Sequence, residues 1–138
     1  MKLTTRSRYG LRAMTYISLH TVGDETVALS EISKELRLSD YYLEQLLRAL
    51  KQGGYIDSVR GAQGGYRLAK PAKEIMVFDV LTLLEGPLWL AECIHAGDCP
   101  GGFSNCPTRI IISRMADAIR ESLDGVSLAD MAEMERAI

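Results

Sequence analysis

Two short amphipathic stretches that are separated only by a tight turn constrain the fold more than any other feature of this sequence. Ser30 and Ser39 both suit the N-cap position of a helix, and apolar residues recur at helical spacing after each of them. The first stretch stops near Leu38 and the second at Gly53, which is followed by another glycine. Two short helices joined by a tight turn are typical of a helix-turn-helix, whose second helix lies in a major groove of DNA.

A β-hairpin is predicted directly after these helices. Residues 55–59 and 66–68 alternate between apolar and polar side chains, and the glycine-rich residues 60–65 join them through a basic tip. A hairpin in this place is a wing, whose arginine can enter a minor groove where the negative potential is high. The alternative, a loop that binds nucleotide phosphates, lacks the lysine and the following helix that such a loop requires.

The rest of the chain predicts a mainly α-helical protein. Further elements are expected as helices at residues 8–21, 78–84 and 108–123, a short strand at 75–77, and a last helix opened by a capping box of Ser127 and Asp130. We therefore expect a winged helix-turn-helix DNA-binding domain at residues 1–86. Residues 87–138 then hold the cysteine segment (residues 89–108), a long C-terminal dimerisation helix and the short last helix.

The predicted helix at 108–123 has a wide apolar face. Its apolar residues on one side are Ile111, Ile112, Met115, Ile119 and Leu123. Such a face packs either on its own domain or on a partner helix, and we expect the second, within a homodimer.

Charge is divided unequally along the 138 residues. Residues 1–70 hold 11 Lys and Arg against 7 Asp and Glu, and residues 71–138 hold 5 against 11, so the formal charge of −2 combines a basic half with an acidic one. This asymmetry favours contact between the first half and a polyanion, although a chance partition gives the same pattern. No apolar run approaches the roughly 20 residues that span a bilayer, and no apolar leader follows the N-terminus. We expect a cytoplasmic protein that does not enter a membrane.

The second short helix carries polar side chains on the face opposite its leucines. These side chains are Tyr41, Tyr42, Glu44, Gln45 and Arg48. Glutamine reads adenine, glutamate accepts a hydrogen bond from cytosine, and tyrosine commonly holds phosphates. A merely solvated face has the same composition, but the predicted wing beside it favours DNA recognition.

Three cysteines form the sharpest chemical feature. Cys93, Cys99 and Cys106 are spaced C-x5-C-x6-C among glycines and prolines. Thiolates ligate iron–sulfur clusters and zinc, whereas the odd number argues against a disulfide framework and the lack of a C-x2-C pair against the commonest zinc site. Either centre takes four ligands, so the fourth is another residue, a small molecule or a group from a second subunit; His95 and Asp98 lie in the same segment. Three unrelated thiols are the alternative.

Together these residues resemble a known family, the bacterial winged-helix regulators that include the iron–sulfur cluster regulator, the nitric-oxide-sensing repressor and the cysteine-metabolism repressor. The resemblance extends to about residue 124 and is carried by residues 1–4, 8–10, 42–46, 59–61, 64–66, 80–86 and the cysteine segment. It implies a homodimer that binds a palindromic operator in double-stranded DNA through two winged helices, with a long C-terminal helix as the dimer contact.

The resemblance also assigns roles to residues on the DNA side. It implies contacts by Tyr42, Glu44 and Gln45 in the recognition helix and by Arg60 and Gly61 in the wing.

For the cysteines, the resemblance implies that Cys93, Cys99 and Cys106 hold a [2Fe-2S] or [4Fe-4S] cluster. The branch of the cysteine-metabolism repressor lacks this trio. Two departures leave the fourth ligand open: the last spacing is x6 in place of the more usual x5, and arginines stand where relatives place a histidine (Arg109) or an acidic ligand (Arg8).

The leading interpretation is a homodimeric transcription regulator, such as a repressor, whose operator affinity depends on an iron–sulfur cluster that senses redox state, nitric oxide or iron–sulfur status. One alternative keeps the regulator and makes the cysteines a cluster-free thiol or zinc sensor. Another is an iron–sulfur electron-transfer protein, which lacks salt-dependent affinity for DNA. Two distant histidines and the lack of a nucleophile motif argue against an enzyme.

Overall fold

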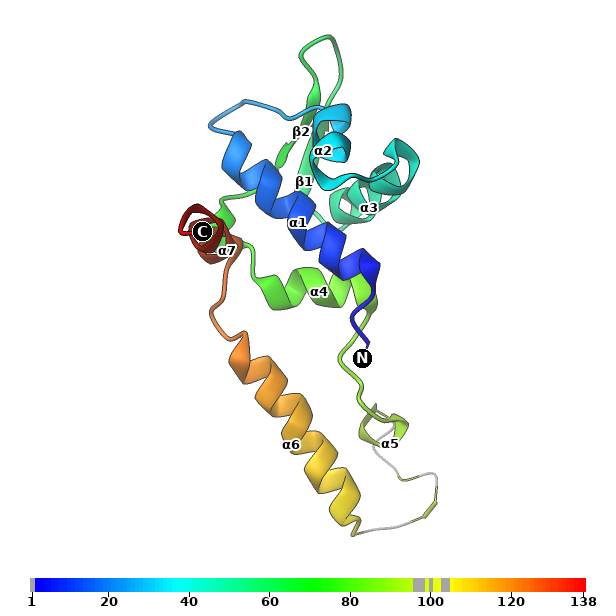
Figure 1. Ribbon diagram of the computed structural model, residues 1–138. Helices are drawn as coiled ribbons and strands as arrows, with labels where there is room; N and C mark the ends of the chain where they lie inside the picture. Colours follow the sequence, from blue (N-terminus) through cyan, green and yellow to red (C-terminus); the bar gives the residue numbers. More distant parts are fainter. Residues whose placement is uncertain (1, 96–98, 100, 103–104) are drawn as a thin grey trace.

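The computed structural model describes residues 2–95, 99, 101–102 and 105–138. In chain order its elements are α1 (Thr5–His20), α2 (Leu29–Leu36), α3 (Asp40–Gln52), β1 (Ile56–Val59), β2 (Gly65–Leu68), the 3-10 turn η1 (Ala72–Glu74), α4 (Val77–Glu85), α5 (Glu92–His95), α6 (Pro107–Ser122) and α7 (Leu128–Arg136). We call the part formed by α1–α4, the hairpin, η1 and α7 the body; α6 projects from it (Figure 1).

The first and third helices begin at side-chain caps. The Thr4 hydroxyl accepts a hydrogen bond from the Arg6 amide at the start of α1, which places this start three residues earlier than the sequence predicted. Ser39 caps α3 as predicted, because its hydroxyl accepts from the Tyr42 amide.

The start of α2 differs from the prediction. The expected N-cap, Ser30, lies inside the helix, and the N-cap is Ala28. Val27 pairs with Tyr66 of β2, and this pairing fixes the backbone just before the helix. The helix ends at Arg37, whose left-handed backbone (φ 55°) turns the chain toward α3 and completes the helix-turn-helix.

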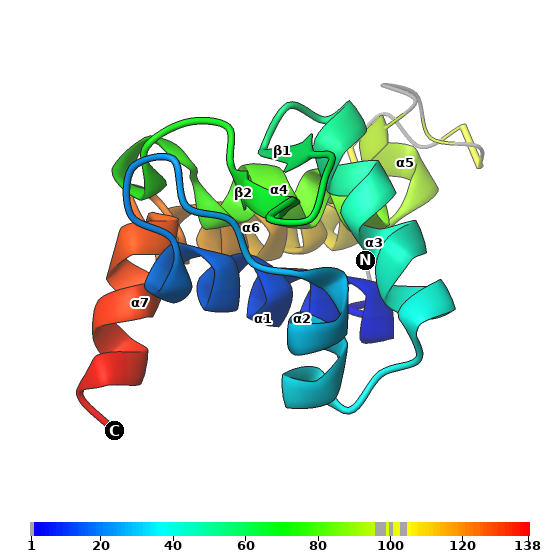
Figure 2. The ribbon, with the colours of Figure 1, turned by 90° about the horizontal axis from the view of Figure 1, so that it is seen from above.

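One hydrophobic core joins all elements of the body. Its fully buried side chains come from each predicted apolar face and include Met14, Ile17, Ile32, Leu43, Leu47, Leu50, Ile56, Ile75, Val80 and Leu128. Seen from above, α3 and α7 lie near opposite ends of α1 (Figure 2). The helix-turn-helix is therefore held on a rigid support.

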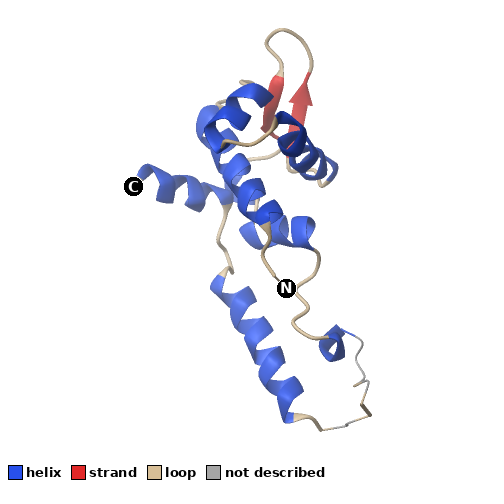
Figure 3. Cartoon of the chain, turned by 45° about the vertical axis from the view of Figure 1, so that its right-hand side comes forward, coloured by secondary structure: helices blue, strands red, loops and turns tan. Residues whose placement is uncertain are grey.

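The two strands form the predicted antiparallel hairpin, with Ile56 opposite Leu68 and Val59 opposite Gly65. It lies at the end of the molecule opposite to α6 (Figure 3). A mainly helical chain with a helix-turn-helix and one such hairpin is a winged helix-turn-helix, so the predicted fold class is confirmed.

The strand predicted at residues 75–77 is wrong. Val77 begins α4, and Met76 makes a single bridge to Ser127. The Leu128 amide donates to the Ile75 carbonyl at 2.8 Å, so this stretch pairs only with the start of α7. That start has the predicted capping box of Ser127 and Asp130, and α7 packs back against α1.

The apolar face of α6 stays largely uncovered. Ile111, Met115 and Ile119 of this face are 53%, 53% and 38% exposed, and Ala116 is the one buried residue of the helix. Within the described part of the chain, the most extensive contact of α6 is with α5, a single helical turn inside the cysteine segment that the sequence did not predict. The body therefore does not supply the covering surface for this helix.

Candidate DNA interface and cysteine segment

Helix α3 turns its leucines inward and its polar side chains outward. Leu43, Leu46, Leu47 and Leu50 are fully buried, which leaves the opposite face to solvent. On that face Tyr41 is 75% exposed, and Glu44 and Arg48 form an exposed ion pair at 3.4 Å. Such a pair contributes little to stability, so both side chains are available to a ligand.

Tyr42 joins α3 to the first turns of α1. Its hydroxyl donates a hydrogen bond to Oγ1 of Thr5 at 3.2 Å, and its ring meets that of Tyr9 edge to face, with centroids 6.4 Å apart. The Arg8 guanidinium lies 6.0 Å from the centre of the Tyr9 ring. The N-terminal turns of α1 thus extend the polar surface of the recognition helix with a cation and a second phenol.

The wing is attached to the recognition helix. Lys51, in the last turn of α3, donates a hydrogen bond to the Ser58 hydroxyl of β1. Burial, and next the nearby Glu44 carboxylate, raise the pKa of Tyr66 in β2, while Arg48 lowers it. The hydrogen bond of Lys51 thus joins the end of α3 to the first strand of the hairpin.

At the tip of the wing, Arg60 is exposed and forms no hydrogen bond or ion pair within the described residues. Gly61 follows with φ +116°, a conformation that L side chains rarely adopt. The tip of the wing therefore exposes the guanidinium of Arg60, and the turn that follows it has a backbone conformation that favours glycine at position 61.

The loop between α1 and α2 also contacts the wing, through residues other than those of α3. The Thr26 hydroxyl donates to the Gln63 carbonyl at 2.9 Å, and Arg67 pairs with Asp24 at 3.3 Å. Val27 and Tyr66 exchange two backbone hydrogen bonds of 2.9 and 2.8 Å. The direction of the wing is thus set by two segments of the body, this loop and the end of α3.

The three cysteines lie in the cysteine segment as free, half-buried thiols. Cys93 belongs to α5, Cys106 is the N-cap residue of α6, and Cys99 lies between them. The backbone amide of Arg109 acts most strongly to lower the pKa of the Cys106 thiol, as expected at a helix N-terminus. Among the residues that the structure describes, no three His, Cys, Asp or Glu side chains form a group able to hold a metal ion.

The other ligand candidates are placed only in part. His95 closes α5, and Asp98 lies outside the described residues. Arg109 follows Cys106 in the first turn of α6, and Arg8 lies on α1 beside Tyr9. The fourth ligand stays open.

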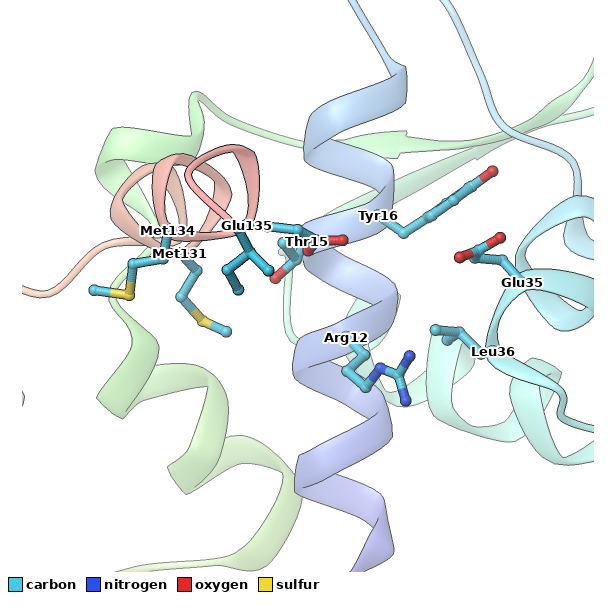
Figure 4. A pocket seen from close by; sticks show the side chains of 9 residues that line it. Arg12, Thr15, Tyr16, Glu35, Leu36, Met131, Met134 and Glu135 are labelled. Atoms are coloured by element: carbon cyan, nitrogen blue, oxygen red, sulfur yellow. The ribbon is translucent and has the colours of Figure 1, made fainter.

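A groove of about 480 Å³ lies apart from both candidate sites (Figure 4). It is formed by Arg12, Thr15 and Tyr16 of α1, Glu35 and Leu36 of α2, and Met131, Met134, Glu135 and Ile138 of α7. None of the predicted DNA or cluster residues lines it.

The structure thus brings together Tyr42, Glu44 and Gln45 on one helix and places Arg60 and Gly61 on the hairpin attached to it. Their contacts with DNA stay predictions. Sequence reasoning gave no role to Lys51, which follows Arg48 by one helical turn and could have been found from that spacing. It also missed that Arg8 and Tyr9 lie against α3, a contact between distant segments that local periodicity does not encode.

No helix in the described part of the chain is both long enough and apolar enough to cross a lipid bilayer.

Comparison with known proteins agrees with this architecture. Residues 3–134 match the family Rrf2, described as an iron-dependent transcriptional regulator. The chain is 40% identical over 131 residues to the protein rrf2 of Nitratidesulfovibrio vulgaris. The aligned region covers 95% of this chain and 87% of that protein.

Two solved structures have the same fold. The global cysteine regulator CymR of B. subtilis has 33% identity and a TM-score of 0.82, with 97% of this chain and 98% of that one covered. IscR of T. potens has 36% identity and a TM-score of 0.78, with 98% and 88% covered. These relatives are regulators, in agreement with the expectation that the chain is not an enzyme. The chain belongs to the Rrf2 family of winged-helix transcriptional regulators.

Proposed function

We propose that this protein is a cytoplasmic, homodimeric transcription regulator whose affinity for a palindromic operator is controlled by an iron–sulfur cluster on Cys93, Cys99 and Cys106. One observation carries the proposal: three free thiols lie between a winged helix-turn-helix body and a projecting helix with an uncovered apolar face. The similarity to IscR supports the cluster.

The chemistry of the three thiols suits an iron–sulfur centre, and binding would have to draw them together, because they do not form a metal-binding group among the described residues. The three thiols are half-buried and unpaired with one another, and the position of Cys106 at a helix N-terminus favours the thiolate that ligation requires. Cys93 of α5 and Cys106 at the start of α6 would be among the ligands, and the cluster would supply a centre sensitive to redox state and nitric oxide. A group from the partner subunit or a small molecule would complete its coordination.

The body supplies DNA recognition. In each protomer α3 enters a major groove with Tyr42, Glu44 and Gln45, and the wing places Arg60 and Gly61 at the neighbouring minor groove. The charge of residues 1–70, 11 Lys and Arg against 7 Asp and Glu, favours this side for the phosphates.

The apolar face of α6 supplies the dimer contact. Exposed Ile111, Met115 and Ile119 would be buried against the same face of a second copy, in an isologous arrangement. Because Cys106 caps this helix, a change in the cysteine segment alters how α6 is held and hence the separation of the two recognition helices.

The first test is anaerobic purification from iron-replete cells, with iron and sulfide counted per chain and with visible and Mössbauer spectra. We expect the signature of a [2Fe-2S] or [4Fe-4S] centre in the wild type and its loss in Cys99→Ala. Ser113→Ala, a substitution on α6 outside the cysteines, is the control and keeps the spectrum.

Binding is then measured by fluorescence anisotropy with a duplex that the wild-type protein selects from a random-sequence library. We expect the cluster-loaded wild type and Cys99→Ala to differ in affinity. Equal affinities would show that the cluster does not control DNA binding.

A cluster-free thiol sensor is the second candidate function. The lowered pKa of Cys106 and the similarity to the cysteine regulator CymR favour it. Colourless protein after anaerobic purification, metal-free or with bound zinc, would support this candidate and leave the DNA-binding body unchanged.

A further inference from the structure

The end of α4 and the start of α1 are joined by a carboxylate with an unusual set of partners. Oε1 of Glu85 accepts hydrogen bonds from the Thr4 amide at 2.7 Å, from the Thr4 hydroxyl at 2.7 Å and from the Ser7 amide at 3.2 Å. Three donors thus converge on one oxygen of a residue 81 positions away from Thr4 in the sequence. A carboxylate at a helix N-terminus is stabilised by the unpaired amides of the first turn.

The electrostatics of Glu85 agree with this geometry. Partial burial acts to raise its pKa, but the hydrogen bonds from Thr4 and Ser7 outweigh burial and lower the pKa to about 2. The contact is therefore between a charged carboxylate and fixed donors across the physiological pH range.

The packing around the contact is tight. Arg6 Nε donates to the Leu84 carbonyl at 3.3 Å. Gly10 leaves no room for a Cβ, which would overlap the Leu84 side chain. The end of α4 and the first turns of α1 are therefore in direct contact through a hydrogen bond and close packing.

The same turns of α1 hold the recognition helix. Thr5, next to Thr4, accepts the hydrogen bond from the Tyr42 hydroxyl, and Tyr9 packs on the Tyr42 ring. On the other side, Glu85 is the last residue of α4, and the chain continues through Gly86 toward Cys93, eight positions further on. Glu85 thus lies between the cysteine segment and Tyr42.

We propose that Glu85 is a positioning residue that transmits the state of the cysteine segment to the recognition helix, through the first turn of α1 and the hydrogen bond between Thr5 and Tyr42. The transmission of a cluster signal rests on the proposed function. The positioning of Tyr42 does not, because the contacts that carry it lie entirely within the body.

Positioning is tested in the cluster-free protein with a double-mutant cycle. The affinities of the wild type, Glu85→Ala, Tyr42→Phe and the double variant are measured for the duplex selected by the wild type. If Glu85 acts through Tyr42, each single variant weakens binding, and the double variant loses no more than the larger single loss. Independent effects, in which the two fold-changes multiply, would overturn the proposal.

Two further variants separate positioning from damage to the fold. Glu74→Ala removes an exposed carboxylate from the same body and keeps wild-type affinity. Thr4→Val removes the hydroxyl that both donates to Glu85 and caps α1, and it leaves Glu85 and the Thr4 amide in place. The cycle can therefore be repeated with Tyr42→Phe if Glu85→Ala unfolds, and the loss of the cap is read from the thermal unfolding of Thr4→Val alone. Thermal unfolding by circular dichroism identifies any variant that has lost its fold.

Transmission is tested by comparing affinities with and without the reconstituted cluster. In the wild type we expect a ratio of about fivefold or more, typical of coupled sites, and in Glu85→Ala a ratio close to one with the cluster spectrum retained. If the affinities of the wild type with and without the cluster are equal, the proposed control by the cluster is wrong. The double-mutant cycle still tests separately whether Glu85 positions Tyr42. A Glu85→Ala ratio equal to a large wild-type ratio would overturn the transmission.

Discussion

The backbone of Gly65 in β2 crosses that of Val27 so closely that a Cβ on Gly65 would overlap the Val27 carbonyl group. This crossing is the point where the wing meets the loop that leads into α2, and it carries the two hydrogen bonds between Val27 and Tyr66. The direction of the wing is thus coupled to the start of the helix-turn-helix.

Gly65→Ala is expected to separate the wing from this loop. The overlap must be relieved by a backbone shift, which costs roughly 1–3 kcal/mol in a tightly packed site. We expect a lower midpoint of urea denaturation and weaker binding of the selected duplex. Ala62→Ser, at the exposed tip of the same hairpin, is the control and leaves both unchanged. A stable Gly65→Ala variant with normal affinity would show that the close crossing is not needed.

Arg60→Ala is expected to weaken DNA binding by removing a cation from the wing tip. Because each phosphate contact releases counterions, the slope of log affinity against log salt falls in magnitude by about one if Arg60 meets a phosphate. Fluorescence anisotropy over a salt series measures this slope. Gln63→Ala, whose side chain lies on the same tip, keeps the wild-type slope, and an unchanged slope in Arg60→Ala would place the arginine outside the interface.

Charged residues on the apolar face of α6 are expected to separate the dimer. Ile111→Glu combined with Ile119→Glu places two carboxylates about one and three helical turns from the start of α6, where an apolar partner cannot solvate them. Analytical ultracentrifugation should show monomers, and affinity for a duplex with two half-sites should fall. The control is Asp117→Asn on the exposed side of the helix. A double variant that stays dimeric would exclude this face as the interface.

Glu85 is expected to make stability depend on pH in acid. Its pKa is lowered from an ordinary value of 4.5 to about 2 in the folded protein, so the unfolded chain binds a proton first as the pH falls. The stabilisation by the charged form is complete above pH 4.5 and is lost progressively between 4.5 and about 2.

The measurement for Glu85 is urea denaturation of the wild type and Glu85→Gln at a series of pH values. The difference in unfolding free energy between the two proteins should be largest near neutral pH and should shrink as the pH falls through this window. Glu74→Gln, which changes an exposed carboxylate, should give no such trend. A constant difference between wild type and Glu85→Gln would show that the carboxylate is not held as described.

The sequence predicted those parts of the fold that depend on local patterns. Ser39 caps α3 and Ser127 opens α7 because a hydroxyl next to the first turn is sufficient for a cap, whatever lies further away. The start of α2 was misplaced because the pairing of Val27 with Tyr66, a contact between distant residues, overrides the local preference of Ser30. The same holds for residues 75–77, which have strand-like side chains but only the start of α7 to pair with.

The candidate sites were predictable to a different extent. Periodicity was enough to place Glu44 and Gln45 on the outer face of α3, since the leucines fix which side is buried. The contact of Glu85 with Thr4 has no such signal, because neither residue type nor local spacing relates two positions that are 81 residues apart in the sequence. The presence of three cysteines indicates ligation of an iron–sulfur cluster or zinc, but their spacing does not identify the fourth ligand.

The two ends of α6 are connected to different parts of the molecule. At its C-terminal end the chain returns to the body within a few residues, where Val126 accepts from the Val77 amide at 3.0 Å and Ser127 pairs with Met76. At its N-terminal end α6 begins directly after Cys106, which belongs to the cysteine segment. A helix of 16 residues is about 24 Å long, so the Cys106 end lies far from the residues near Leu123 that return the chain to the body. A small rotation of α6 about those residues would therefore displace the Cys106 end more than any other part of the helix.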